Sequence, residues 1–515
     1  DDLLRAMRNN KKDLDDTLNT VLKQFGTSQA MDGRVYAAGE YSPTPTIVEA
    51  AVTLYRSHSV DNITRSDAEA INLKQTTETV NQVIVSAQSN RVKAICFVTG
   101  VPGAGKTLVG LTVATAQLGQ STDRASVYLS GNAPLVAILQ EALARDKVQR
   151  EKQQGKRLAK VEAKQAVKLF IQNIHHYRDE YVSKVQAPYD HIAIFDEAQR
   201  AWNKEQTVDF MARKKGIPNF DHSEPEFLIS CLDRHEDWAV VICLVGGGQE
   251  INTGEAGIAE WLHAISHKFK HWKVYISPHL SDSEYNAQKS IAQLSTTQAV
   301  TLKEELHLKV SMRSFRAEHL SQFVKHLLDI RPQEAKEILE KFHFKYPIAL
   351  TRNLTTAKTW LRNMARGNER YGILVSSQAQ RLKPLAIDVR PKINPVNWFL
   401  DGRDDVRSSY YLEDVATEFD VQGLELDWSC VTWDGDLRFS GKSWNSHSFK
   451  GKKWQRINQD VRRMYQINAY RVLLTRARLG MVIVVPEGDN DDPTRLPEFY
   501  DHTYHYLQGL GLKVL

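Results

Sequence analysis

Short apolar runs alternate with longer amphipathic segments along most of this chain from residue 93 onward. The first series comprises "KAICFVTG", "SVYLSG", "HIAIFDE" and "AVVICLVGGG". A second series begins near residue 300 with "AVTLKEELH", "YGILVSSQ", "YYLEDVATEF", "SCVTWDGD" and "MVIVVPEG". Apolar runs bounded by glycine and polar residues are typical of buried strands, and their alternation with helical patterns predicts parallel sheets covered by helices. We therefore predict an α/β protein with two domains in series.

The same pattern sets the expected domain boundaries. Residues 1–90 carry helical periodicity and form a predicted N-terminal helical region. Because the chain begins at Asp1 rather than at a methionine, we expect an upstream domain before it. Residues 91–300 form the first predicted α/β domain and residues 301–515 the second. A charged helical insertion at about 136–186 is expected to be a solvated hairpin, a reading we favour over a nucleic-acid contact.

Composition narrows the class of protein only slightly. The 515 residues are 42% hydrophobic and 25% charged, as in ordinary soluble domains, and the formal net charge is +5. This mild positive charge is compatible with a nucleic-acid partner without requiring one. The four cysteines lack metal-ligand spacing, which favours a reducing, cytoplasmic setting, and the apolar runs are too short to span a membrane.

The stretch "VTGVPGAGKTLVGL" predicts a phosphate-binding loop between a strand and a helix. Gly100, Gly105, Lys106 and Thr107 fit the spacing G-x-x-x-x-G-K-[ST], and Gly103 lies within the loop. Glycines let backbone N–H groups surround phosphates, the lysine reaches the β and γ oxygens, and the threonine hydroxyl ligates Mg²⁺. We therefore predict ATP and Mg²⁺ as the bound groups.

The stretch "HIAIFDEAQRAW" supplies the second half of this predicted site. A buried strand ends at Phe195 and is followed by Asp196 and Glu197. We expect Asp196 to hold Mg²⁺ and Glu197 to orient or deprotonate the attacking water, since these are the tasks of carboxylates beside a nucleotide. The alternative is an ordinary strand end with surface acids.

Three segments further along the chain indicate how nucleotide hydrolysis could be sensed and used. Gln249 follows a strand and a glycine turn, where its amide could contact the γ-phosphate and the water, although a plain turn fits equally well. In "VQGLELDW", Gly423 allows close backbone approach to a ligand, which we expect to be nucleic acid, and Glu425 could accept hydrogen bonds from a ribose. Arg476 and Arg478 interrupt the apolar stretch "RVLLTRARLGMVIVV", and a charge there needs a partner.

Taken in order, "GVPGAGKT", "DEAQ", "GGGQE", "SMRS", "VQGLE" and "LLTRAR" resemble superfamily 1 helicases with two RecA-like domains. More narrowly, "PTPTIVEAA", "ICFVTGVPGAGKT", "FDEAQRAW" and "NAYRVLLTRAR" resemble the bacterial Schlafen group-3-like DNA/RNA helicase domains. The resemblance implies that ATP binds between the two domains, that Arg313 and Arg476 reach the γ-phosphate, and that Gln249 couples hydrolysis to closure. For Arg476, a structural salt bridge within the second domain is the rival reading.

The resemblance also implies contacts with adenine and with nucleic acid. Gln75 would recognise adenine, although it stands far upstream of the phosphate-binding loop. Ser130 and Asn132 match the region that touches the nucleic-acid backbone, and an N-cap on the next helix is the alternative for them. The sequence departs from superfamily 1 helicases in two places. Gly246 to Gly248 stand where those helicases usually carry a turn with an aspartate. Residues 313–418 leave little room for the large insertion found in processive unwinding enzymes.

A basic stretch interleaved with aromatic residues, "RFSGKSWNSHSFKGKKWQRINQDVRR", lies between the last two motifs. Lys452 and Lys453 are expected to contact phosphates, and Trp444 is a candidate for stacking on an unpaired base. A β-hairpin with its aromatic rings packed onto the second domain is the alternative, which we favour slightly for the tryptophans.

These observations predict an ATP-dependent helicase or translocase acting on single-stranded nucleic acid, DNA more than RNA, in antiviral defence or DNA processing. The alternative is an ATP-gated switch that controls a fused or partner nuclease without processive unwinding. The two differ in whether single strands stimulate ATP hydrolysis.

Overall fold

The computed structural model describes residues 46–57, 67–100, 103–116, 125–246, 257–281, 287–309 and 315–515. The described residues 46–365 and 369–515 pack together in one structural unit. Within the described ranges, no helix is both long enough and apolar enough to cross a bilayer. All four cysteines are buried and free.

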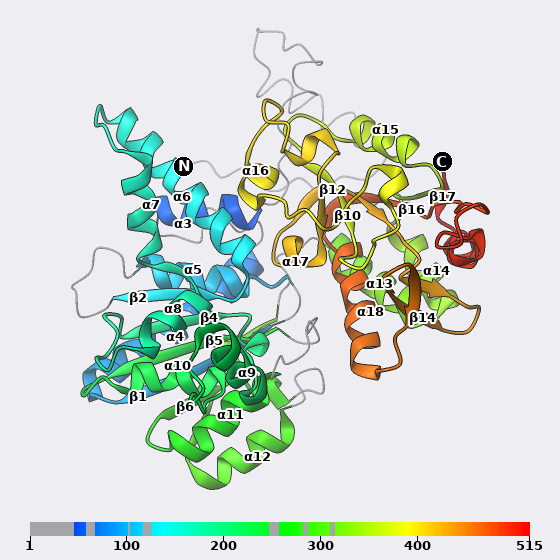
Figure 1. Cartoon of the computed structure of the whole chain (residues 1–515). Coiled ribbons are helices and arrows are strands. Elements are labelled where there is room, and N and C mark those ends of the chain that lie inside the picture. The colour runs from blue at the N-terminus through cyan, green and yellow to red at the C-terminus, as the bar shows by residue number, and fades with distance from the viewer. Residues whose placement is uncertain are drawn as a thin grey trace, which may run out of the picture. The chain divides into compact units, whose positions relative to one another are not determined.

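The first sheet is built on parallel strands, as predicted (Figure 1). Its order is β3-β2-β4-β5-β1-β6-β7, and β8 pairs with the end of β1. The strands are β1 (Lys93–Gly100), β2 (Ser126–Ser130), β3 (Ile171–Asn173), β4 (Ile192–Asp196), β5 (Ala239–Leu244), β6 (Lys273–Ile276), β7 (Val300–Leu302) and β8 (His307–Leu308). Because parallel strands end at the same edge, the ends of β1, β2 and β4 lie together.

Alternating side chains on these strands form two cores, one on each face of the sheet. Cys96 and Ile194 pack with α4 (Asp67–Asn90) and α5 (Lys106–Ala116) in one cluster. Phe97 and Phe195 pack in the other with α10 (Glu224–Asp233) and α11 (Gly257–Lys268). This alternation is the period of a strand buried on both faces.

The predicted insertion at 136–186 is a set of separate elements. It contains α6 (Ala133–Gln153), α7 (Lys160–Lys168), β3 and α8 (Ile174–Val182). The helices α6 and α7 form the expected hairpin, but α6 buries Leu135, Ile138 and Leu139. The remaining helices before the second sheet are α3 (Ile47–Ser57), α9 (Lys204–Lys215), α12 (Gln288–Thr297), α13 (Phe315–Leu328) and α14 (Pro332–Phe342).

The second sheet is also parallel, in the order β11-β10-β12-β16-β9-β17. Its strands are β9 (Ile348–Thr351), β10 (Tyr371–Val375), β11 (Val415–Thr417), β12 (Leu426–Thr432), β16 (Ala477–Val484) and β17 (Lys513–Val514). The helices of this part are α15 (Leu354–Met364), α16 (Pro395–Leu400), α17 (Glu418–Val421), α18 (Asp460–Leu474) and α19 (Asp501–Gly509). The predicted fold class, α/β with two parallel sheets, is confirmed.

The change from the first sheet to the second falls later than the predicted boundary. Residues 300–302 form β7, which pairs with β6, and residues 307–308 form β8, which pairs with β1. The run "AVTLKEELH" therefore completes the first sheet. Its short alternating pattern identifies a strand but carries no information on which sheet the strand joins.

The basic and aromatic stretch forms an antiparallel sheet of β13 (Leu437–Phe439), β14 (Trp444–Lys450) and β15 (Lys453–Arg456). Trp444 is buried, stacks on Trp433 and donates a hydrogen bond from Nε1 to the Leu328 carbonyl at 3.0 Å. Its burial corrects the assignment of Trp444 as a stacking platform for nucleic acid, and the packed-hairpin alternative describes it instead. Lys452 and Lys453 are exposed at the β14–β15 turn.

Candidate functional site

The phosphate-binding loop lies at the end of β1 and leads into α5. Gly103 and Gly105 have positive φ angles of 76° and 87°, which other residues adopt only with strain. A Cβ on Gly100 would lie 2.7 Å from the Cβ of Leu308, so β8 excludes a side chain there. Lys106 opens α5 and donates a hydrogen bond to the Gly100 carbonyl at 2.8 Å.

Asp196 ends β4 and is held by two hydroxyl groups. Thr107 Oγ1 donates to its carboxylate at 3.1 Å, and the Tyr128 hydroxyl donates to Oδ2 at 2.5 Å. Burial and the neighbouring Glu197 charge raise the pKa of Asp196 to about 7, while the bonds from Tyr128 and Thr107 oppose that rise. Sequence reasoning missed Tyr128, because an apolar strand pattern does not distinguish a tyrosine that packs from one that donates.

Glu197 follows in a left-handed backbone conformation, with φ 53° and ψ 47°. Such a conformation is uncommon for a residue other than glycine and is typical of sites where the chain must aim a side chain. Gln199, within the 3₁₀ turn η2 (Ala198–Arg200), donates from Nε2 to Glu197 Oε2. Gln199 Oε1 accepts a hydrogen bond from the Gly246 N–H at 2.9 Å. Sequence reasoning used the "DEAQ" motif but gave no role to its glutamine.

These residues fit MgATP. A threonine hydroxyl and a carboxylate within hydrogen-bond distance of each other are the oxygen ligands that Mg²⁺ uses beside a phosphate-binding loop. The N-terminus of α5 and the positive-φ glycines place backbone N–H groups where phosphate oxygens would lie. Thr107 and Asp196 would thus hold the metal, and the metal would neutralise charge on the phosphates.

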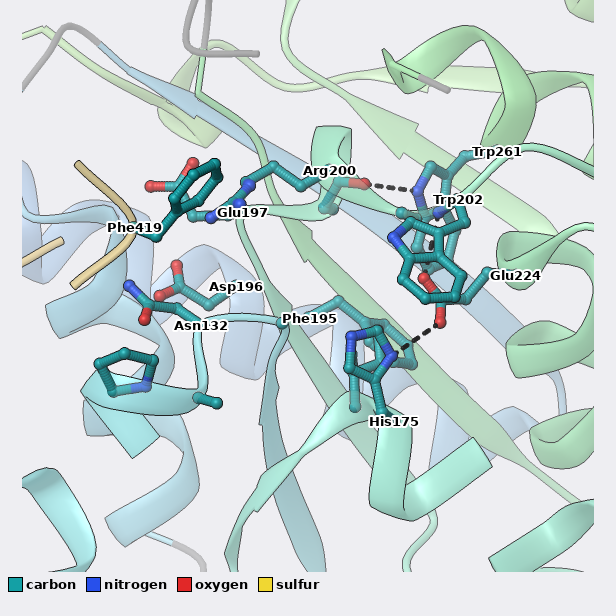
Figure 2. A pocket seen from close by; sticks show the side chains of 16 residues that line it. Asn132, His175, Phe195, Asp196, Glu197, Arg200, Trp202, Glu224, Trp261 and Phe419 are labelled. Atoms are coloured by element: carbon teal, nitrogen blue, oxygen red, sulfur yellow. Dashed lines mark hydrogen bonds and ion pairs between the residues drawn. The ribbon is translucent and has the colours of Figure 1, made fainter. Parts of the chain in front are cut away.

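A pocket of about 250 Å³ opens beside the two acids (Figure 2). Its walls come from the β2–α6 loop, the start of α8, the segment after β4 and Phe419 of α17. Trp202, His175 and Glu224 line the side away from Asn132. Sequence reasoning did not predict this pocket, because its walls come from segments far apart in the chain.

Glu224 is the anchor of the Trp202 wall. Its carboxylate accepts hydrogen bonds from Arg178 Nη1 at 3.0 Å and from the Trp202 backbone N–H at 3.1 Å. Burial alone would raise the pKa of Glu224, but His175 and Arg178 outweigh it and hold the pKa below its ordinary value. The fully buried Arg178 also lies over the Trp202 ring, 5.2 Å from its centroid.

Three of the residues expected to contact nucleic acid lie close together, and one of them, Asn132, lines the pocket. Ser130 is buried at the end of β2, and Asn132 caps α6 by accepting a hydrogen bond from the Leu135 N–H at 3.2 Å. The Asn132 amide also donates to the Gln422 carbonyl. Gly423 has a φ of 75°, and a Cβ there would lie 3.4 Å from Asn132 Nδ2. The N-cap alternative for Asn132 is thus realised, and Asn132 also joins α6 to the "QGLE" segment.

The arginines of the last motif lie in different environments. Arg476 is buried, and its Nε donates to the Val472 carbonyl at 3.2 Å at the end of α18. Arg478 pairs with Asp427 on β12 and has a structural role there. The assignment of Arg476 to a γ-phosphate stays a prediction.

Four further residues were predicted to contact the nucleotide. Gln249 and Arg313 lie outside the described residues. Gln75 is exposed on α4, one residue before Thr76, which bonds to the Glu305 carbonyl at 2.7 Å. Glu425 is half-buried immediately before β12. Adenine and ribose contacts stay predictions for Gln75 and Glu425.

A strand, a glycine loop and a helix beside an acid-bearing parallel strand define a P-loop protein, here with two RecA-like sheets in tandem. The family model "Schlafen group 3, DNA/RNA helicase domain" matches residues 93–487, and the chain belongs to this family. The protein is therefore helicase-like.

Comparison with solved structures finds a similarity to the helicase domain of Hef from Pyrococcus furiosus, at 12% identity and a TM-score of 0.27. The match covers 80% of this chain and 96% of that one. None of the curated proteins matches the chain.

Proposed function

We propose that this chain hydrolyses ATP with Mg²⁺ and uses the energy to translocate along, or unwind, single-stranded nucleic acid, DNA more than RNA. The carrying observation is the array of Thr107, Asp196 and Glu197 beside a phosphate-binding loop, in a chain of a helicase-domain family. We further propose a cytoplasmic, superfamily 1 enzyme that acts in antiviral defence or DNA processing.

Each residue of the array has a distinct task in this proposal. Lys106 binds the β and γ oxygens, and Thr107 and Asp196 hold the metal. Glu197 orients the attacking water and accepts its proton, with its carboxylate fixed by Gln199. Gln249, Arg313 and Arg476 sense and stabilise the transferred phosphoryl group; an arginine in this role is worth ~10³–10⁵ in rate.

The test is ATP hydrolysis with and without single-stranded DNA and RNA at two salt concentrations. We expect stimulation that weakens as salt rises, because strand binding releases counterions from the phosphates. Lys106→Ala should abolish hydrolysis, whereas Lys156→Ala, on the exposed loop after α6, should not. Hydrolysis that survives Lys106→Ala would overturn the nucleotide site.

The alternative, an ATP-gated switch, predicts that single-stranded nucleic acid does not stimulate hydrolysis. The Asn132–Gln422 contact links the first sheet to the "QGLE" segment. A switch needs such a link, and the link does not depend on bound nucleic acid. Slow turnover that neither DNA nor RNA stimulates would favour control of a fused or partner nuclease over translocation.

A further inference from the structure

We propose that the pocket beside Asp196 and Glu197 takes one unpaired nucleobase of the bound strand, and that Trp202 and His175 form its recognition wall. This proposal rests on the proposed function, since it concerns the same nucleic-acid ligand. It adds a contact with a base beside the first sheet, where Ser130 and Asn132 were expected to touch only the nucleic-acid backbone. Figure 2 shows the pocket between this wall and Asn132.

The wall is rigid because a buried network supports it. The rings of Trp202 and His175 lie 4.8 Å apart and are tilted by 41°, and Phe210 packs edge-on against Trp202 at 5.1 Å. The fully buried Arg178 binds Glu224, which in turn accepts the Trp202 backbone N–H. A ring held in this way loses little conformational entropy when a ligand stacks on it.

The lining of the pocket suits a planar base. Trp202, His175 and Phe419 give it aromatic side chains, beside both acidic groups and the basic Arg200. A nucleobase is neutral and planar, and its face stacks favourably on an aromatic side chain. His175 Nδ1 lies 3.5 Å from Glu224 Oε1, and this contact helps to hold the imidazole ring in the wall.

The position of the wall connects base binding to hydrolysis. Trp202 follows the turn η2, which carries Gln199 and begins next to Glu197. Trp261 fastens this turn by donating from Nε1 to the Ala198 carbonyl at 2.8 Å. A base that presses on Trp202 therefore acts on the short segment that positions Glu197. The proposal predicts that stimulation of hydrolysis depends on bases as well as phosphates.

The experiment compares oligothymidylate with a fully abasic strand of equal length and equal charge. Binding is measured by fluorescence anisotropy and stimulation by the ATPase rate. We expect the abasic strand to bind through its phosphates but to stimulate at least ~5-fold less, which is the kinetic equivalent of about 1 kcal/mol of stacking. Trp202→Ala should remove the difference between the strands, and Trp202→Phe should retain most of it.

Tyr189→Ala serves as the matched control, because Tyr189 is an exposed aromatic residue of the same part of the chain that does not line the pocket. It should preserve both the basal rate and the difference between strands. Thermal unfolding of each variant confirms that it is folded. Equal stimulation by both strands, or an undiminished difference in Trp202→Ala, would overturn the pocket proposal alone. Failure of every strand to bind or stimulate would instead overturn the proposed function.

Discussion

Gln199 joins Gly246 to Glu197: its Oε1 accepts the Gly246 N–H at 2.9 Å, while its Nε2 donates to the Glu197 carboxylate. The turn after β5 is thereby tied to the residue proposed to activate water. A Cβ on Gly246 would lie 3.0 Å from Gln199 Nε2 and 3.2 Å from Glu197 Oε2, so a side chain there would crowd both groups. The backbone of Gly246 makes this link at the end of the described part of the turn.

Replacing Gln199 with alanine should slow hydrolysis more than it weakens nucleotide binding. Without the amide, the Glu197 carboxylate loses its fixed orientation, and one such hydrogen bond is worth about 1 kcal/mol. We expect kcat to fall by roughly 5- to 10-fold and the affinity for a fluorescent ADP to change less than about 2-fold. Gln172→Ala on β3 is the control, since its amide donates a hydrogen bond to the nearby Leu169 carbonyl and Gln172 does not line the pocket. An unchanged kcat in Gln199→Ala would contradict this role.

Tyr128→Phe should weaken Mg²⁺ binding at the nucleotide site, so that nucleotide binding needs a higher Mg²⁺ concentration. The phenol donates to Asp196 at 2.5 Å, and loss of such a supporting hydrogen bond typically costs 10- to 100-fold in metal affinity. The measurement is a Mg²⁺ titration of fluorescent ADP binding, which does not depend on turnover. Tyr275→Phe, on β6 of the same sheet, should leave the titration midpoint in place. If the Mg²⁺ titration curves of Tyr128→Phe and the unaltered chain coincide, the Tyr128 hydroxyl does not support the metal site and the ring has only a packing role.

Gly110→Ala should destabilise the first sheet. A Cβ at this position would lie 2.7 Å from Leu244 Cδ1 and 3.1 Å from Ile194 Cγ2, so the helix α5 must move away from the strands. We expect the free energy of unfolding to fall by about 1–3 kcal/mol, measured by denaturant titration. Gly509→Ala on α19 meets no atom within 4 Å and should be neutral or slightly stabilising. Equal stability of the two variants would contradict the packing of α5.

Glu418 should make stability fall as pH rises. Burial raises its pKa from 4.5 to about 7, although hydrogen bonds from Ser377 oppose the shift. Between these values the folded chain keeps a proton that the unfolded chain releases, so the free energy of unfolding decreases with increasing pH. Glu418→Gln cannot titrate and should reduce this decrease between pH 5 and pH 8. Parallel pH profiles for the two proteins would argue against the raised pKa.

The nucleotide site was predictable because its signals are local. The loop from Gly100 to Thr107 and the pair Asp196 and Glu197 each follow a buried strand directly, and the spacing of residues carries the chemistry. Parallel strands then bring the two segments together, as Thr107 and Asp196 show. Most strands of the two sheets were predictable for the same reason, since they are apolar runs. The short strands β3 and β17 are exceptions, because each contains polar or charged residues and gives no such signal.

The contacts around this site were not predictable from local patterns. Tyr128 reaches Asp196 across neighbouring strands, and Trp202 depends on Arg178 and Glu224 from two separate helices. The sequence also left the environment of Trp444 open, because an aromatic residue in a basic hairpin fits packing and nucleic-acid contact equally well. In the structure Trp444 is buried against Trp433, which shows that its ring packs within the protein. Burial of this kind depends on the whole fold and cannot be seen in the local sequence.

The pairing of β8 with the end of β1 has a practical consequence for dissecting the molecule. A fragment cut at residue 300 would lose β7 and β8, leaving the hydrogen-bonding groups of β6 unpaired along one side. Exposed strand edges of this kind favour aggregation. The same cut would remove Leu308 from beside Gly100, loosening the first turn of the phosphate-binding loop. An isolated nucleotide-binding half should therefore extend through Lys309.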